Sequence, residues 1–329
     1  MKALLTGATG FIGGSVLSEL LRSGYQVRAL VRKGSRLNSN IFRDVEVVFG
    51  DVRDIDSVET ALDGCDVLCH AAAVYTFWTP NPRDVYETNV KGTENVLKVA
   101  LAKRIEKVVY TSTESTICLD KESGLGTEES IRSPDDVSGH YKKSKCLAEA
   151  VALRMCDQGL PLVVVNPTTP VGAGDVKPTP TGQLIVDFLN GRMPAYVNTG
   201  LNLIDVADVA RGHILALERG RVGERYILGN ANLTFKDILS LLEQVTGLKA
   251  PRLRIPIWLA LGAAYVDELV ASRVAKRPPR IPVAAVKTAS SFRYFDCSKA
   301  IRELGLPQTP VKMALEKAVR WFRHNGYAR

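Results

Sequence analysis

Two residues near the middle of the sequence have the types and the spacing for acid–base chemistry at a carbonyl or alcohol oxygen. Tyr141 and Lys145 are four positions apart in a stretch with helical periodicity, so they share one helix face. A nearby ammonium group favours the phenolate and lowers the pKa of the phenol, which suits Tyr141 for exchanging a proton with a substrate oxygen. The Tyr-x-x-x-Lys pattern also arises by chance, so this interpretation depends on a second motif.

The second motif is the glycine-rich segment 6–13, which lies between a strand-like run and an amphipathic helix. Glycine permits the tight turn and the close approach of a pyrophosphate, and the N-terminus of the following helix supplies unpaired N–H groups. The segment predicts a dinucleotide site, with a ligand-free turn as the alternative. The predicted contacts are Gly7, Thr9, Gly10, Phe11, Ile12 and Gly13. A nicotinamide held there would exchange a hydride with the carbon next to the oxygen that Tyr141 serves.

Cations follow the second predicted strand, where dinucleotide sites of this kind bind the ribose of the adenosine. Arg32 and Lys33, with Arg36 nearby, stand where an Asp or Glu would accept hydrogen bonds from a free 2′-hydroxyl. Guanidinium and ammonium groups pair instead with a 2′-phosphate. The sequence therefore favours NADP(H), and NAD(H) bound beside exposed cations is the alternative.

The pattern of apolar segments predicts the α/β scaffold that positions these motifs. Short apolar runs predict parallel strands at 2–6, 25–31, 45–49, 66–70, 106–111 and 161–166, with helices between most of them. Beyond Pro167, loop-rich sequence leads to helices near 181–190, 206–218, 235–245, 256–272 and 311–325 and to strands near 195–197 and 224–228. We therefore predict a Rossmann-type doubly wound parallel sheet over 1–167. A smaller, irregular α/β substrate-binding region covers 168–329, with some segments returning to the first domain.

Composition, cysteine spacing and charge argue against a disulfide- or metal-stapled protein, a membrane-spanning protein and a nucleic-acid-binding protein. The 329 residues, 46% hydrophobic and 24% charged, can bury a large core without disulfide or metal staples. The six cysteines include no Cys-x-x-Cys pair, so no metal site is predicted. The chain opens directly on a strand-like run and lacks the ~20 apolar residues of a membrane span, so we expect a cytoplasmic protein without one. A net charge of +8 selects no partner by itself, and the basic patch Arg273, Lys276, Arg277 and Arg280 is too small to predict nucleic-acid binding.

Seven motifs stand in the order and at the intervals found in extended short-chain dehydrogenases/reductases, which the chain resembles over essentially its whole length. They occupy 6–13, 50–52, 70–73, 89–93, 111–113, 141–145 and 166–167. The resemblance implies that Thr113 bonds the substrate oxygen, that Tyr141 is the acid/base and that Lys145 binds the nicotinamide ribose. It places the remaining cofactor contacts at Asp51, Val52, Ala71, Ala72, Ala73, Asn89, Pro167 and Thr168. Thr113 as a backbone cap and Asn89 as a purely structural residue are the alternatives.

Within that superfamily the second half is most similar to dihydroflavonol-reductase-like proteins and to a bacterial group named hopanoid-associated sugar epimerases. This likeness rests on 177–182, 198–206 and 223–229. Leu201 stands where nucleotide-sugar members have an arginine that faces the diphosphate, and Glu114-Ser115 replaces the Asp-Glu pair of dehydratases. We therefore predict an NADP(H)-dependent reductase of a ketone or aldehyde. An NAD-dependent sugar or nucleotide-sugar epimerase with retained cofactor is the alternative, and a dinucleotide sensor without turnover is a third hypothesis.

No sequence motif in the second region, 168–329, identifies the substrate. Phe77, Trp78, Phe188, Tyr196 and Leu201 suit a bulky hydrophobic substrate, although isolated residues of this kind more often belong to the core. The apolar segment 255–270 ends in the basic patch, which leaves contact with a membrane surface as an alternative to a solvated loop. The resemblance also implies a homodimer packed through 83–103 and 138–157.

Overall fold

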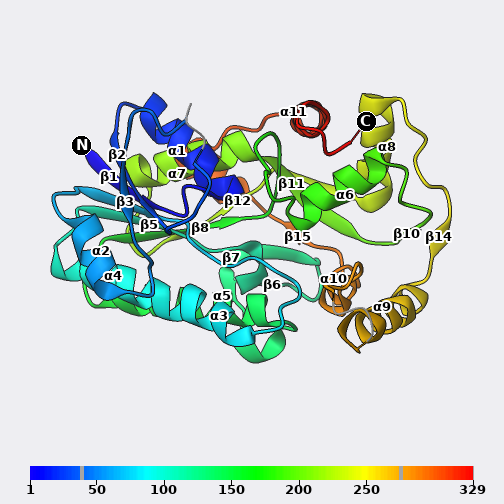
Figure 1. Ribbon diagram of the computed structural model, residues 1–329, viewed down its shortest axis with the longest axis horizontal. Coiled ribbons are helices and arrows are strands. Elements are labelled where there is room, and N and C mark those ends of the chain that lie inside the picture. The colour runs from blue at the N-terminus through cyan, green and yellow to red at the C-terminus, as the bar shows by residue number, and fades with distance from the viewer. Residues whose placement is uncertain (38–40, 274–276, 329) are drawn as a thin grey trace.

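The computed structural model describes residues 1–37, 41–273 and 277–328, and a seven-stranded parallel sheet forms the centre of this part of the chain (Figure 1). The strand order is β12-β8-β5-β4-β1-β2-β3. The strands are β1 Lys2–Thr6, β2 Gln26–Val31, β3 Val45–Phe49, β4 Val67–His70, β5 Lys107–Thr111, β8 Leu162–Pro167 and β12 Arg225–Leu228. The central strands are buried along nearly their whole length, as continuous apolar runs covered on both faces must be. The predicted doubly wound α/β fold is confirmed.

Two helical layers cover the sheet, one on each face. The first face carries α1 (Phe11–Arg22) and α7 (Val206–Arg219), whose buried side chains share one core with β1 and β2. The second face carries α2 (Ile55–Leu62), α4 (Gly92–Ala102) and α5 (His140–Asp157). A short helix α3 (Pro82–Tyr86) runs through the π-helical turn η1 (Glu87–Lys91) into α4. Helix α5 therefore presents its N-terminal turn near the carboxyl ends of β4 and β5.

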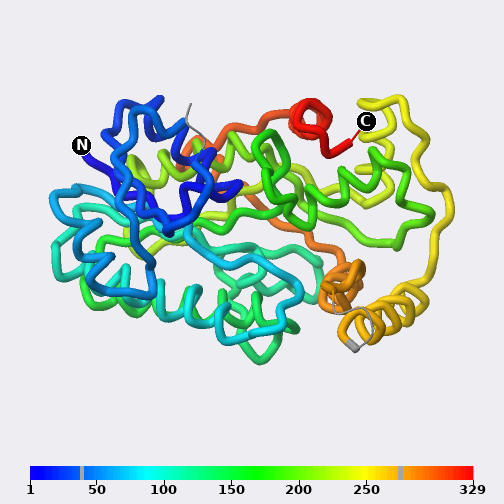
Figure 2. The backbone as a smooth tube through the Cα atoms, viewed as in Figure 1, coloured from blue at the N-terminus to red at the C-terminus, as the bar shows by residue number. Residues whose placement is uncertain are grey.

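The second region has its own core beside this sheet and occupies the right-hand side of the tube in Figure 2. Its helices are α6 Pro180–Leu189, α8 Phe235–Thr246, α9 Ile257–Arg273, α10 Val283–Thr288 and α11 Val311–His324. The small sheets are β13-β11-β9, β15-β7-β6 and β10-β14, formed by β6 Ile117–Leu119, β7 Leu125–Ile131, β9 Thr169–Val171, β10 Tyr196–Val197, β11 Gly200–Asp205, β13 Ala231–Thr234, β14 Arg254–Ile255 and β15 Tyr294–Phe295. The five helices predicted from the sequence in this region agree with α6, α7, α8, α9 and α11 to within about two residues.

Two elements from beyond Pro167 belong to the central sheet. Strand β12 pairs with β8, and α7 packs against α1. The predicted return of late segments to the first domain is consistent with this topology, and the division at residue 167 stays a prediction. Of the strands in the small sheets only β10 was predicted, and β6, β7, β9, β11, β13, β14 and β15 were not. Strand β15 has only two residues, which pair with Leu125 and Gly126 far away in the sequence and so leave no periodicity to detect.

Candidate active site

The glycine turn between β1 and α1 leaves no room for side chains where a pyrophosphate would approach. Gly7 has a φ of +80°, and its carbonyl accepts a hydrogen bond from the Gly10 N–H at 2.9 Å. A Cβ on Gly13 would collide with the Gly7 carbonyl, and a Cβ on Gly7 would lie 2.7 Å from the Ala71 backbone. Helix α1 begins at Phe11 without a side-chain cap and without an acidic residue in its first turn. Its free N–H groups and positive dipole end therefore fit an anionic phosphate group.

The neighbouring edge of the sheet brings two arginines beside Asp51. Arg32 follows β2 and is exposed, as is Lys33, and the positive charge of Arg32 helps to lower the pKa of Asp51. The largest cause of that lowered pKa is Arg53, whose Nε and Nη2 donate to the Asp51 carboxylate at 3.0 and 2.8 Å. Val52 is buried against α4, where its carbonyl accepts from Asn95 Nδ2. Arg53 was not predicted from the sequence, although it follows the 50–52 motif directly.

The segment after β4 is fixed by the side chain of Asn89. Ala71, Ala72 and Ala73 follow His70 at the carboxyl end of β4, and Ala73 is exposed. The Asn89 amide exchanges two hydrogen bonds with the Val74 backbone, at 2.7 and 3.1 Å, and donates to Ser144 Oγ of α5 at 2.9 Å. The π-helical turn η1 therefore ties the segment 71–74 to the helix that carries Tyr141 and Lys145.

Thr113 and Tyr141 meet at the carboxyl end of β5. Burial raises the pKa of the Tyr141 phenol, and a hydrogen bond with the Thr113 side chain acts in the opposite direction. The predicted lowering of this pKa by Lys145 is not found, because the Lys145 ammonium is bound to Tyr110 and to the Thr111 carbonyl instead. Thr113 also caps the 3₁₀ turn η2 (Glu114–Thr116), because its Oγ accepts from the Ser115 N–H at 3.3 Å. The Tyr141 ring lies 4.6 Å from the ring of Tyr75, centroid to centroid. The structure thus brings together the two oxygens that were predicted to act on one substrate oxygen.

Lys145 lies behind Tyr141 and is almost completely buried, with 2% exposure. Its Nζ donates to Tyr110 Oη at 2.9 Å and to the Thr111 carbonyl at 2.8 Å. Burial lowers the pKa of Lys145 to about 8, and the charge of Glu149 opposes this shift. The ammonium group is therefore charged at neutral pH and held in one place by two acceptors.

A chain of buried hydrogen bonds continues from Tyr110 back to β1. The Tyr110 hydroxyl shares a hydrogen bond with Thr93, whose Oγ lies 3.0 Å from His70 Nε2. His70 Nδ1 lies 2.7 Å from Thr6 Oγ, which accepts from the Ala72 N–H. Burial lowers the pKa of His70 to about 3, so this imidazole stays neutral. The chain connects the predicted catalytic lysine with the turn that follows β4.

Residues of strands β8 and β12 hold Thr113 and Glu149 in position. Asn166 Nδ2 donates to the Thr113 carbonyl at 3.1 Å and to Glu149 at 3.0 Å. Glu149 in turn forms a buried ion pair with Arg225 of β12 at 2.8 Å. Pro167 ends β8, and the Thr168 hydroxyl donates to Asn202 Oδ1 at 2.9 Å. Thr168 thus lies just beyond the carboxyl end of β8, and its side chain is hydrogen-bonded to Asn202 of β11.

Comparisons with known proteins agree with this geometry. Residues 3–229 match the model of the NAD dependent epimerase/dehydratase family. The chain belongs to that family. A protein of Synechocystis sp. named "Putative dihydroflavonol 4-reductase" is 46% identical, with 99% of this chain and 95% of the relative covered. The sterol demethylase protein B of Methylococcus capsulatus is 33% identical, with 99% of each chain covered. The crystal structure of gox2253 is 39% identical, covers 99% of each chain and has a TM-score of 0.87.

Membership in the epimerase/dehydratase family confirms the predicted resemblance and identifies the chain as an enzyme of the NAD(P)-dependent reductase, dehydrogenase and epimerase type. The predicted contact residues at the ends of β1, β4, β5 and β8 lie at the carboxyl edge of the central sheet, where open α/β sheets bind their ligands. The glycine turn has the geometry that a dinucleotide site needs: its backbone is packed too closely for side chains at Gly7 and Gly13, and the N-terminus of α1 is uncapped.

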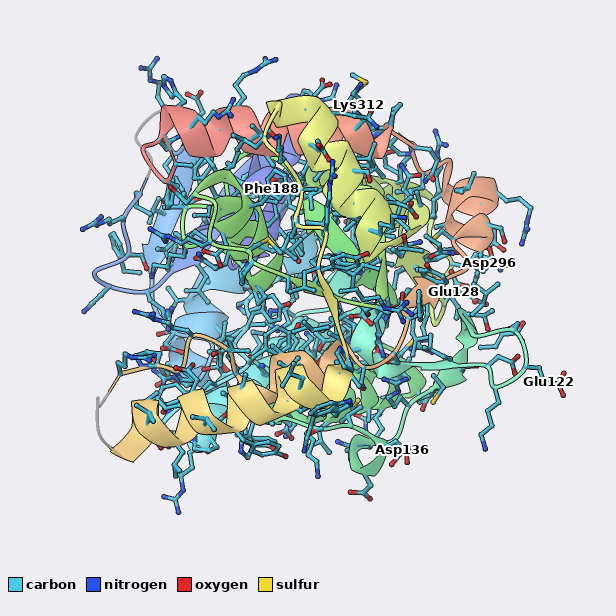
Figure 3. The ribbon with its side chains drawn as sticks, turned by 90° about the vertical axis from the view of Figure 1, so that its right-hand side faces the viewer. Glu122, Glu128, Asp136, Phe188, Asp296 and Lys312 are labelled. Atoms are coloured by element: carbon cyan, nitrogen blue, oxygen red, sulfur yellow. The ribbon has the colours of Figure 1, made fainter. Side chains whose placement is uncertain are left out.

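The predicted apolar substrate contacts divide into two groups. Phe188 lies on α6 and is buried in the core of the second region, and Tyr196 and Leu201 pack against that core (Figure 3). The ring of Phe77 packs against the ring of Tyr75, with 5.8 Å between their centroids, and Tyr75 in turn packs against Tyr141. Tyr75 was not predicted, although it lies in the same aromatic stretch as Phe77. Phe188 is a core residue and not a substrate contact, which was the alternative given for isolated residues of this kind.

A buried ion pair closes the site opposite Tyr141. Arg293 is 4% exposed, and its guanidinium binds both the carboxylate and the backbone carbonyl of Glu114, the residue after Thr113. The backbone of Arg293 bridges to Leu201. Nearby, Lys142 donates to Thr288 Oγ of α10 at 2.7 Å, and burial lowers the pKa of Lys142 to about 8. Arg293 and Lys142 are therefore already engaged by partners within the chain.

Proposed function

We propose that the chain is an NADP(H)-dependent reductase of a bulky, apolar ketone or aldehyde, with Tyr141 as the acid. The observation that carries the proposal is that Thr113 and Tyr141 lie next to each other at the sheet edge, with the buried Lys145 ammonium one helical turn further along α5. Both oxygens can face one carbonyl oxygen, as required of a hydrogen-bond donor and a proton donor.

The residues take separate roles in this reduction. The nicotinamide cofactor, when bound, supplies the hydride. Because burial raises the pKa of Tyr141, its phenol holds the proton that the substrate oxygen must receive. Lys145 is charged below a pH of about 8, and its role in this proposal is to bind the ribose of the nicotinamide. Thr113 donates a hydrogen bond and keeps the oxygen in line with Tyr141.

The preference for NADP(H) is supported by the charges beside β2 and β3. An NAD site of this type would need a carboxylate free to accept from the ribose hydroxyls. At this edge Asp51 is occupied by Arg53 through three hydrogen bonds, whereas Arg32 is exposed. The exposed Arg32, followed by the exposed Lys33, suits a 2′-phosphate, which carries about two negative charges.

The ion pair of Arg293 supports a reductase over an enzyme of nucleotide sugars. With Leu201 in place of the diphosphate-facing arginine, another cation would have to hold the diphosphate. Arg293 is adjacent to Leu201, but Glu114 neutralises it, and freeing a buried partner of such a pair costs about 3–5 kcal/mol. The epimerase alternative keeps its support from the family, whose description names that activity.

The state of the cofactor after purification distinguishes the two activities. A reductase must release its oxidised cofactor in each cycle, whereas an epimerase restores its cofactor and can retain it. We expect mass spectrometry of the denatured protein to find an empty site or a trace of NADP(H), and apolar ketones and aldehydes to consume NADPH in a spectrophotometric assay. Near-stoichiometric NAD, together with no NADPH consumption across the panel, would replace this proposal with the epimerase.

A further inference from the structure

Helix α9 is packed with its small side chains inward and its large apolar side chains outward. Ala264 and Ala271, seven residues apart on one face, are fully buried. Trp258 is 69% exposed and Val266 is 63% exposed, and Tyr265 is exposed as well. A helix on the surface of a globular protein ordinarily shows the opposite arrangement. The exposed side of α9 therefore has the composition of a contact surface.

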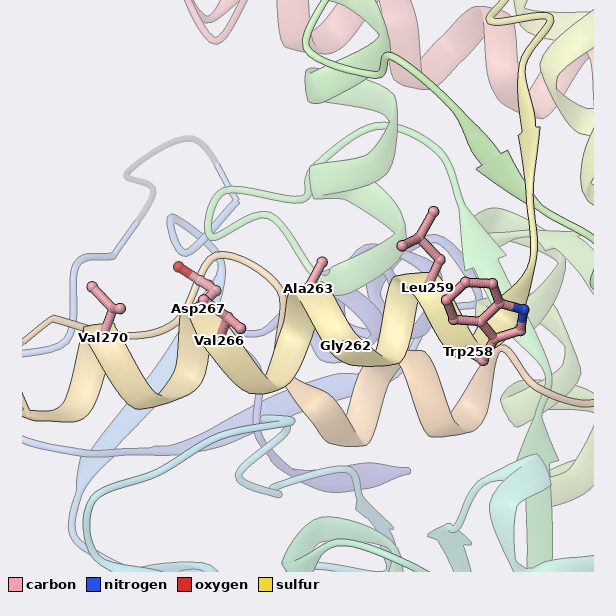
Figure 4. A pocket seen from close by; sticks show the side chains of 7 residues that line it. All are labelled: Trp258, Leu259, Gly262, Ala263, Val266, Asp267 and Val270. Atoms are coloured by element: carbon pink, nitrogen blue, oxygen red, sulfur yellow. The ribbon is translucent and has the colours of Figure 1, made fainter.

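The exposed apolar residues are concentrated around this helix. Among the described residues, eight of the nineteen exposed large apolar side chains lie between 253 and 281. Seven residues of α9 line a shallow groove of about 580 Å³, shown in Figure 4: Trp258, Leu259, Gly262, Ala263, Val266, Asp267 and Val270. Contiguous apolar patches of this kind mark surfaces that bind a protein or a membrane. We call the exposed apolar residues of 253–281 the α9 patch.

The charges around the α9 patch are predominantly positive. The segment 250–290 contains seven Lys and Arg residues against two Asp and Glu, a net charge of +5 out of +8 for the whole chain. Both carboxylates are occupied within the chain: Asp267 accepts from Arg277 and from the N–H groups of Arg280 and Ile281, and Glu268 accepts from the Val283 N–H. Exposed cations remain at Arg252, Arg254, Arg280 and Lys287. Of the predicted basic patch, Lys276 and the side chain of Arg273 lie outside the described residues.

We propose that the α9 patch docks on the surface of an anionic lipid bilayer, with α9 lying in the plane of the interface. Apolar side chains flanked by cations are the composition that binds such a surface, and the amphipathic indole of Trp258 suits the headgroup level. A second copy of this chain fits less well, because a twofold contact through α9 would place these cations against one another. Among the described helices, none has the length and apolar character to cross a bilayer.

The position of the patch connects it with the candidate active site. Helix α9 packs on α10, and Thr288 of α10 accepts the hydrogen bond from Lys142, the neighbour of Tyr141 on α5. Helix α10 therefore connects α9 with the helix that carries the acid–base residues. This proposal depends only on the surface of α9 and not on the reaction that Tyr141 performs.

Sedimentation of the full-length protein with vesicles tests the proposal. The vesicles contain phosphatidylcholine alone or phosphatidylcholine mixed with phosphatidylglycerol. We expect binding only to the mixed vesicles, weakened by added salt. In Val266→Gln/Leu269→Gln the binding is lost. In Arg280→Gln/Lys287→Gln the partition coefficient falls roughly 25-fold, since each cation near an anionic surface contributes a factor of about five.

Matched variants control for surface polarity and net charge. Ile131→Gln/Val222→Gln removes two equally exposed apolar residues elsewhere, and Lys312→Gln/Arg320→Gln removes two exposed cations from α11, at the opposite edge of the view in Figure 3. Both controls are expected to bind as the parent does. The proposal is overturned by absent binding, by equal binding to phosphatidylcholine alone, or by controls that lose as much binding as the α9 variants. Light scattering that finds a dimer dissociated by Val266→Gln/Leu269→Gln would assign the patch to a second copy instead.

Discussion

The carboxyl edge of the central sheet and the segment around α9 use the same kinds of residues in opposite ways. At the sheet edge, polar groups such as Lys145, Asn89 and Thr113 are buried and each has a partner. Around α9, large apolar side chains are exposed while alanines fill the contact with the rest of the protein. The first arrangement fixes distances between atoms, which proton transfer requires. The second arrangement defines few distances between atoms inside the protein and leaves apolar surface exposed for a binding partner.

Because of this difference, a substitution in one region should not change the activity or the binding that depends on the other region. A change at the sheet edge removes an atom from a defined geometry, so its effect is on rate or on cofactor affinity. A change on the α9 patch alters surface composition, so its effect is on binding to a surface. Each variant below is therefore expected to leave vesicle binding unchanged, and this measurement accompanies every kinetic one.

The largest effect is expected from Tyr141→Phe. The phenylalanine keeps the ring that packs against Tyr75 but removes the proton donor. General acid catalysis contributes about 10²–10⁴-fold, and we expect kcat to fall by that factor with NADPH affinity nearly unchanged. Steady-state assays of NADPH oxidation and a fluorescence titration of NADPH measure the two quantities.

Tyr25→Phe is the matched control for this variant, because Tyr25 precedes β2 at the opposite end of the sheet. It is expected to retain the parental rate. Turnover by Tyr141→Phe within a factor of a few of the parent would contradict the assignment of Tyr141 as the acid.

How much the sequence could predict differs between the two regions for a physical reason. The glycine turn and the shared helix face of Tyr141 and Lys145 were predictable because they depend on local spacing, within one turn or along one helix. The buried strands β4, β5 and β8 were predictable because continuous apolar runs suit a sheet that is covered on both faces. These signals are all contained in short stretches of the chain.

The partners that hold those residues come from distant stretches and have no such local signal. Tyr110 is 35 residues from Lys145, and Arg293 is 179 residues from Glu114. In the sequence, Tyr110 is one aromatic in a strand, and Arg293 is one cation in an irregular segment. Their roles depend on tertiary contacts. For α9 the sequence left a membrane contact as one alternative, but it did not indicate which side chains face outward, because that depends on how the helix packs.

The second prediction concerns the fit of the glycine turn. In Gly13→Ala the new methyl group collides with the Gly7 carbonyl, which belongs to the backbone and cannot rotate away. Overpacking of this kind costs about 1–3 kcal/mol, so NADPH affinity should fall roughly 10- to 100-fold if the turn opens to accept the methyl group. Isothermal titration calorimetry measures the change.

Gly14→Ala provides a close control, since its Cβ would lie 3.5 Å from the Ala8 carbonyl, an ordinary contact. Alanine also has the higher helix propensity, by about 1 kcal/mol, so the control should be as stable as the parent or more stable. Equal NADPH affinity in Gly13→Ala and Gly14→Ala would show that the turn does not hold the pyrophosphate.

The third prediction tests the choice of cofactor. Arg32→Ala removes the exposed guanidinium beside Asp51, and the loss of one charge-assisted contact with a 2′-phosphate should raise the KM for NADPH roughly tenfold. The KM for NADH should stay the same, because NADH lacks that phosphate. Arg43→Ala, an exposed arginine outside this edge, is the control. Parallel increases for NADPH and NADH would mean that Arg32 contacts a part that both cofactors share.

The smallest effect is expected from Tyr110→Phe, and it appears in the pH dependence. Lys145 has a pKa lowered to about 8 by burial, so activity that needs its ammonium should decline as the pH rises through about 8. Removing the Tyr110 hydroxyl takes away an acceptor that favours the charged form, which lowers the pKa of Lys145 further, by roughly one unit for a bond of about 1.4 kcal/mol. The alkaline limb of kcat should therefore move to lower pH, with a several-fold loss at pH 8 and almost none at pH 6. A purely structural role of Tyr110 would instead lower the melting temperature and reduce kcat equally at every pH.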